Sequence, residues 1–190
     1  IGTEQSKGPK IFCVSGHVNR PGNYELPLGV TLREVIYEHA GGVRMGRRVK
    51  AVIPGGASTP ILTGDQLDVP MAFETLAAAG SALGTGAVIV MDETTDMVEV
   101  TRRITSFFAH ESCGRCMPCR IGGRRMLDVL DKIGTGKGTS SDLERLDSLV
   151  KGITAITFCP MGTGMCEPVV SGLMQFRDEF EAKVRAPLHA

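Results

Sequence analysis

The chain has 190 residues, of which 42% are hydrophobic and 22% charged. It therefore has enough apolar material for one ordinary domain or two small ones, and intrinsic disorder is excluded. The 21 Lys and Arg residues balance 21 Asp and Glu residues. Because a net charge of zero provides no uniform positive field, no nucleic-acid partner is expected.

The sequence predicts a protein of a reducing compartment. Its six cysteines are too few for a disulfide framework, and four of them lie between Cys113 and Cys159. The first thirty residues lack the apolar segment of a signal peptide. The run from Met71 to Met91 carries one charge but is interrupted by glycines, which predicts a loop followed by a strand rather than a membrane span. The first residue is Ile rather than Met, which is typical of a fragment of a longer chain.

Residues 1–92 read as a small α+β domain. A β-rich run from Ile11 to Val18 leads through a type II turn, with Pro21 and Gly22 at its centre, into a second strand at 23–26. Thr31 is the expected N-cap of a short helix that ends at Gly41 and Gly42. Further strands are predicted at 50–53 and 88–90, which gives a sheet crossed by one helix.

Residues 93–190 show the 3.6-residue period of a four-helix bundle. Ser141 and Glu144 have the spacing of a capping box at the start of the third helix. The four expected apolar faces are Met97, Val100, Ile104, Phe107 and Phe108; Met126, Leu130 and Ile133; Leu143, Leu146 and Val150; and Val169, Leu173, Phe176 and Phe180.

The strongest chemical signal is a C-x2-C-x2-C motif formed by Cys113, Cys116 and Cys119 at the end of the first bundle helix. Such spacing lets one loop supply three thiolates to an iron-sulfur cubane, while a distant segment supplies the fourth. Cys159, which precedes a proline in the loop between the third and fourth helices, is the natural fourth ligand. Pro118 is well placed as the first residue of a helix whose positive end would point to the cluster.

Other interpretations of the cysteines remain open. Structural zinc usually takes two ligands from each of two separate knuckles, so the motif favours a cluster over zinc. Cys166 could replace Cys159 as the fourth ligand, but its position at the expected start of the last helix favours a packed thiol. Cys13 lies in a strand pattern and is expected in the core. His110 precedes Cys113 by three residues and would either approach the cluster or be a partly buried histidine.

No other catalytic motif stands out. The glycines at 80, 84 and 86 precede a strand instead of following one, unlike a dinucleotide-binding fingerprint. The glycine-rich segment 134–138 lacks P-loop spacing. His17, His39 and His189 belong to no recognisable arrangement.

Four segments resemble the flavin-carrying, NADH-oxidising subunit of respiratory complex I. They are 15–24 (SGHVNRPGNY), 51–56 (AVIPGG), 84–92 (GTGAVIVMD) and 110–120 (HESCGRCMPCR). The resemblance implies a soluble-ligand-binding β-grasp domain followed by a helical domain that binds a [4Fe-4S] cluster through Cys113, Cys116, Cys119 and Cys159. It also implies that FMN and NAD(H) are bound by an upstream domain that is absent here.

The resemblance implies electron transfer from flavin through the cluster to a partner iron-sulfur subunit. The implied partners are the upstream flavin and NADH domain, a [2Fe-2S] thioredoxin-like subunit and a further iron-sulfur subunit. The implied location is the cytoplasm or the cytoplasmic face of the inner membrane as a peripheral arm, which in a eukaryote is the mitochondrial matrix side. The alternatives are a diaphorase subunit of an NAD(P)-linked hydrogenase or formate dehydrogenase and, in another class, a zinc-stabilised interaction domain.

Overall fold

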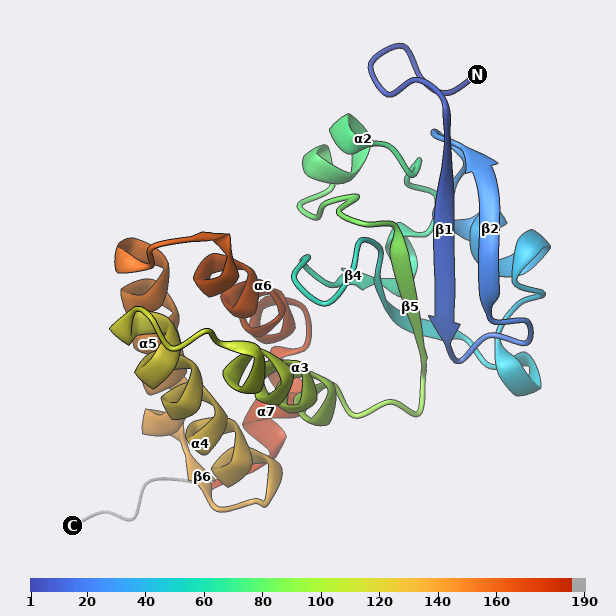
Figure 1. Ribbon diagram of the computed structural model, residues 1–190. Coiled ribbons are helices and arrows are strands. Elements are labelled where there is room, and N and C mark those ends of the chain that lie inside the picture. Colours follow the sequence, from blue (N-terminus) through green and yellow to red (C-terminus); the bar gives the residue numbers. More distant parts are fainter. Residues whose placement is uncertain (186–190) are drawn as a thin grey trace. The chain divides into compact units, whose positions relative to one another are not determined.

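The computed structural model describes residues 1–185. They fall into two compact units, which divide between Thr95 and Asp96 (Figure 1). The first unit is a sheet with short helices and the second is helical, so the mixed α+β class predicted from the sequence is confirmed. The last residues of the predicted bundle, 186–190 with His189, lie outside the described residues.

The first unit is a five-stranded sheet in the order β2-β1-β5-β3-β4. The pairing of β1 with β5 is parallel and the other three pairings are antiparallel. The last strand thus lies at the centre of the sheet, next to the first (Figure 1). The elements are β1 (Pro9–Gly16), β2 (Gly22–Pro27), α1 (Leu32–Glu34), η1 (Val35–His39), η2 (Arg44–Gly46), β3 (Val49–Ile53), β4 (Leu62–Thr63), η3 (Gly64–Gln66), α2 (Phe73–Ala78) and β5 (Ala87–Asp92).

The core of this unit lies between the sheet and the α1–η1 helix. Thr31 caps α1 in a capping box with Glu34, as the sequence predicted for the N-cap. The helix buries Leu32, Val35 and Ile36 completely. Gly41 and Gly42 then take positive φ angles of 73° and 79° and end it.

Three local predictions in the first unit are wrong. Gly22 has no positive φ, so the predicted type II turn does not form, and the positive φ of 87° falls instead on Gly16. A Cβ on Gly16 would lie 2.2 Å from the carbonyl oxygen of Val90, so the close approach of β1 to β5 requires glycine. Cys13 is exposed because β1 alternates, with Phe12 and Val14 facing the core. The predicted loop before β5 contains α2, a short helix.

The second unit contains four main helices that pack side by side, joined by short connections (Figure 1). A π-helical turn leads directly into the second of them, and a short helix follows the fourth. β6 lies between α4 and α5 and pairs in parallel with β7. The elements are α3 (Met97–Glu111), η4 (Pro118–Gly122), α4 (Gly123–Gly134), β6 (Gly138–Thr139), α5 (Ser140–Ile156), α6 (Pro160–Gln175), α7 (Arg177–Ala182) and β7 (Val184–Arg185).

The buried face of α3 differs from the predicted one. It carries Thr101 and Thr105 in place of Val100, Ile104 and Phe107. Thr101 can be buried because its hydroxyl donates to the carbonyl of Met97, 2.8 Å away, so no polar group of its side chain is left unpaired. The faces of α4 and α5 agree with the prediction, since each of their named apolar residues is buried.

The helix ends in the second unit also need correction. The capping box of α5 uses Thr139 and Asp142, two residues before the predicted pair. The last predicted helix is two helices, α6 and α7, because the chain bends at Phe176 between them. In addition, α6 begins earlier than predicted, at Pro160. In the described part of the chain, no helix is long and apolar enough to cross a membrane.

Candidate iron-sulfur site

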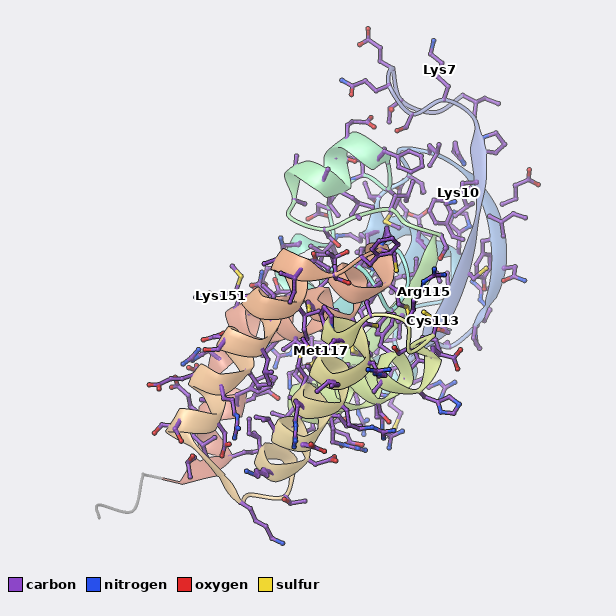
Figure 2. The ribbon with its side chains drawn as sticks, turned by 60° about the vertical axis from the view of Figure 1, so that its left-hand side comes forward. Lys7, Lys10, Cys113, Arg115, Met117 and Lys151 are labelled. Atoms are coloured by element: carbon purple, nitrogen blue, oxygen red, sulfur yellow. The ribbon has the colours of Figure 1, made fainter. Side chains whose placement is uncertain are left out.

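Cys113, Cys116 and Cys119 lie on the connection between α3 and α4. The labelled Cys113, Arg115 and Met117 mark this connection in Figure 2. Gly114 reverses the chain with a φ of 75°, a conformation that favours glycine. Pro118 occupies the first turn of the following helix, as predicted. Cys113 and Cys116 therefore lie on irregular backbone, and Cys119 lies in the first turn of the helix that follows.

Cys159 lies on the connection between α5 and α6. It is the N-cap residue of α6, with Pro160 in the first turn, and its side chain is exposed. Its carbonyl accepts a hydrogen bond from the N–H of Gly162 at 3.1 Å. A helix N-terminus therefore also stands behind the fourth cysteine, and the two dipoles favour negative charge at both connections.

The two connections meet at Cys116. The backbone N–H of Phe158 and that of Cys119 lower the pKa of the Cys116 thiol, and the hydroxyl of Thr157 adds to the effect. The thiolate form of Cys116 is thus favoured by groups of the connection that carries Cys159. The structure brings the cysteine motif and the neighbours of the fourth cysteine together, although they are far apart in sequence.

Cys119 and Cys166 form the buried side of the site. Cys119 is 5% exposed, and its sulfur accepts a hydrogen bond from the Ser112 hydroxyl at 3.2 Å. Cys166 is 2% exposed and lies inside α6, which begins well before the start predicted to be near this residue. Burial raises the pKa of the Cys166 thiol to about 11, so it is a packed neutral thiol, as the sequence predicted. His110 is exposed, so the second of its two predicted alternatives, a partly buried histidine, is wrong.

The cysteines supply the thiol donors that an iron-sulfur cluster takes, but they do not surround a preformed site. In residues 1–185, no three His, Cys, Asp or Glu side chains already surround a common point that could hold a metal ion. The thiols would therefore have to move toward one another when a cluster is inserted. The exposed positions of Cys113 and Cys159, both on irregular segments, allow such a movement. Four thiols from two touching connections are the donors that a [4Fe-4S] cluster takes.

Gly162 is required for the packing of the connection that carries Cys159. A Cβ on Gly162 would lie 1.9 Å from Oγ1 and 2.6 Å from Cβ of Thr157. We expect Gly162→Ala to lower the free energy of unfolding of this unit by about 1–3 kcal/mol through overpacking, although alanine has the better helix propensity. Urea denaturation with Gly162→Ala/Thr157→Gly as the matched double variant checks this. An equal loss in the double variant would contradict the steric explanation.

Sequence reasoning missed a buried acidic network in the first unit. Asp92 is 3% exposed, and its carboxylate lies 3.1 Å from both His17 Nδ1 and a guanidinium nitrogen of Arg47. Thr94 donates to it from both its N–H and its hydroxyl. Burial opposes ionisation, but these donors hold the pKa of Asp92 well below its usual value. The end of a strand and a histidine far earlier in the chain give no sequence signal for such a network.

A surface cavity of about 480 Å³ also lies in the first unit. Its cations already have partners, because Arg33 pairs with Asp68, Arg48 pairs with Glu93 and the ammonium of Lys50 donates to the carbonyl of Thr95. The cavity therefore offers little unpaired positive charge. Its lining comprises Arg33, Tyr37, Arg48, Val49, Lys50, Gly64, Asp65, Leu67 and Glu93.

Comparison with known families identifies both units. Residues 99–183 match the model of the NADH-ubiquinone oxidoreductase-F iron-sulfur binding region. Residues 10–90 match the model of the SLBB domain. The chain thus combines an SLBB domain with an iron-sulfur binding region.

The relatives identify the family more closely. The chain is 50% identical over its whole length to an NADH-quinone oxidoreductase F subunit of Rhizobium meliloti and covers 46% of that protein. It is 47% identical over 97% of its length to the corresponding F subunit of Mycobacterium bovis and covers 41% of it. The chain is therefore a homologue of NADH-quinone oxidoreductase F subunits over its own length, and it spans somewhat less than half the length of these curated relatives.

A solved structure has the same fold. A chain of an NAD+-reducing [NiFe]-hydrogenase in the H2-reduced state superposes with a TM-score of 0.88 at 37% identity. The match covers 99% of this chain and 31% of the hydrogenase chain. The architecture is therefore shared with a redox complex of another kind, at lower sequence identity than with the NADH-quinone oxidoreductase relatives.

Proposed function

We propose that this chain is the electron-transfer module of an NADH dehydrogenase, in which Cys113, Cys116, Cys119 and Cys159 hold a [4Fe-4S] cluster. The observation that carries the proposal is the meeting of the two cysteine-bearing connections at Cys116 and Phe158. The iron-sulfur family match over residues 99–183 supports it. A bound cluster would supply one-electron steps, which suit the splitting of the two electrons of a reduced flavin.

The residues of this chain would hold the cluster and favour its negative charge. The N–H of Phe158 stabilises the thiolate of Cys116, and the two helix N-termini face the thiolates from both connections. Arg120 donates to the carbonyl of Gly114 at 3.3 Å and so fixes the turn between Cys113 and Cys116. FMN and NAD(H) would be bound by another part of the parent subunit.

The surface beside the cysteines supports a protein partner. Phe158 is 83% exposed, and Met117, Ile121 and Ile156 are also exposed large apolar residues. Three of these residues line an apolar cavity of about 210 Å³ between η4 and α5. Exposed apolar patches of this kind mark interaction surfaces. The proposed partners are the flavin and NADH domain of the same subunit, a [2Fe-2S] thioredoxin-like subunit and a further iron-sulfur subunit, on the cytoplasmic or matrix face of the membrane as a peripheral arm.

The second candidate is a diaphorase subunit of an NAD(P)-linked hydrogenase or formate dehydrogenase. The structural match to the NAD+-reducing [NiFe]-hydrogenase favours it. The higher identity to the NADH-quinone oxidoreductase relatives favours the NADH dehydrogenase. Neither candidate assigns a catalytic residue to this chain.

Reconstitution tests the cluster and its ligands. We expect about four iron and four sulfide per chain, a broad brown absorption band and an EPR signal on reduction. Cys113→Ser, Cys116→Ser, Cys119→Ser and Cys159→Ser should each lose the signal, whereas Cys166→Ser, the matched control, should keep it. A colourless chain with one zinc would support the interaction domain instead. Loss in Cys166→Ser with retention in Cys159→Ser would contradict the ligand set.

A flavin-binding assay tests whether this chain binds FMN by itself or whether another part of the subunit does. The sequence contains no glycine-rich phosphate cradle in the right context. We therefore expect this chain alone to bind no FMN tightly and to oxidise no NADH. Equilibrium dialysis with FMN checks this, and stoichiometric FMN bound to residues 1–190 would contradict it.

A further inference from the structure

We propose that Ser112 is a positioning residue that sets the reduction potential of the cluster through its hydrogen bond to Cys119. The inference rests on the proposed function, because it assigns a role toward the cluster that the four cysteines would hold. Ser112 is not a ligand in this assignment. It acts on the electron affinity of the site through the sulfur of one ligand.

The geometry directs the single hydroxyl proton of Ser112 toward the sulfur of Cys119 as a hydrogen bond. The distance from Oγ to Sγ is 3.2 Å. The same oxygen accepts a hydrogen bond from the N–H of Gly114 at 3.4 Å, which leaves the O–H free to point at the sulfur. Ser112 is also the C-cap residue of α3, so its backbone is held by the end of a regular helix.

Cys119 is the thiol of the motif at which such a bond has the largest effect. It is the buried member of the motif, whereas Cys113 is exposed and Cys116 is intermediate. Hydrogen bonds gain strength where water is excluded, and those to charged groups are stronger than neutral ones. A bond from Ser112 to the Cys119 thiolate is therefore screened less than any bond to an exposed thiol.

The sign of the effect follows from the charge change. Reduction adds one electron to the cluster and its four thiolates, without forming or breaking a bond. In the proposed function the reduced flavin supplies this electron. A hydroxyl that donates to a thiolate stabilises the more negative, reduced state more than the oxidised state, so it raises the reduction potential. Removal of the hydroxyl should therefore make the cluster harder to reduce.

Redox titration of the reconstituted chain tests this assignment. The readout is the midpoint potential of the EPR signal, with dithionite as reductant. We expect Ser112→Ala to disfavour reduction by roughly tenfold, which corresponds to about 59 mV for a one-electron couple. Ser112→Thr keeps the hydroxyl and should stay near wild type. Ser148→Ala removes a hydroxyl that bonds the carbonyl of Glu144 on α5 and serves as the matched control.

Each outcome decides between the assignments. An unchanged midpoint in Ser112→Ala at full cluster content would overturn the role of Ser112 and leave the proposed function intact. A wild-type chain that takes up no iron and sulfide would overturn the proposed function and this role with it. If Ser112→Ala takes up no cluster, Ser112→Val and Ser112→Thr are compared. Uptake by the threonine variant alone supports the hydroxyl, and failure of both shows that only the shape of the connection matters.

Discussion

Replacement of Asp92 by alanine is expected to lower the free energy of opening of the first unit by roughly 1.5–3 kcal/mol, the value of hydrogen bonds to a charged group. The carboxylate joins three separate segments, through His17, Arg47 and Thr94. Its loss removes the acceptor of the Thr94 N–H and of the Arg47 guanidinium and leaves a gap at the buried Asp92 position. Hydrogen exchange of the β1 and β5 amides measures the change.

The matched control is Asp68→Ala. Asp68 also pairs with an arginine, Arg33, at 2.5 Å, but both side chains are largely exposed. Exposed ion pairs contribute little to stability, so exchange in this variant should match the wild type. Equal acceleration in both variants would show that burial of Asp92 is not what gives its network its strength.

The Asp92 network also predicts a pH dependence. The pKa of Asp92 is lower in the folded chain than in the unfolded chain. Its contribution to stability is therefore fully present above the unfolded pKa, about 3.9, and is lost as the pH falls through and below that value. We expect wild-type protection of β1 and β5 to decline below about pH 4, and we expect this decline to be smaller in Asp92→Ala. An equal loss of protection at low pH in the wild type and in Asp92→Ala would contradict the role of Asp92 in this pH dependence.

Removal of iron by chelation and oxidation is expected to accelerate hydrogen exchange in residues 96–185 and to leave residues 9–92 protected. A cluster that binds only the folded state adds its binding free energy to stability, and all four proposed ligands lie in the second unit. Without it, the two connections lose their common anchor. The first unit has its own sheet and buried core and contains no proposed ligand.

The control for iron removal is a chain that never held the cluster. Cys119→Ser should exchange like the stripped wild type in both units, which excludes damage by the oxidant. Unchanged protection of α4 and α6 after iron loss would mean that the bundle core is self-sufficient. That core includes Met97, Leu130, Leu146 and Leu173, all of which are buried.

Local signals in the sequence predicted much of the fold. Thr31 with Glu34 is a capping box that needs only neighbouring residues. The periodic apolar residues of α4 and α5 face the core, as their spacing predicts. On α3, the hydroxyl of Thr101 donates to the carbonyl of Met97 and so allows this residue onto the buried face, which hydrophobic periodicity alone cannot anticipate.

Long-range contacts explain what the sequence did not show. The start of α2 was not predicted because the N–H of Phe73 is capped by Ser6, whose hydroxyl also donates to Glu74. The motif at Cys113 to Cys119 and the remote Cys159 were recognisable from spacing. Their contact through Phe158, the hydroxyl of Ser112 on Cys119 and the network around Asp92 depend on tertiary structure.

The central position of β5 has a consequence for synthesis on the ribosome. β1 and β3 leave the ribosome well before β5, yet each pairs with β5 and not with the other. Until residue 92 emerges, both strands have an unpaired edge that another nascent chain could bind. Because β1 and β5 are distant in sequence, their pairing is also a slow step of folding. During the interval between translation of β3 and translation of β5, these two unpaired edges are therefore open to aggregation with other nascent chains.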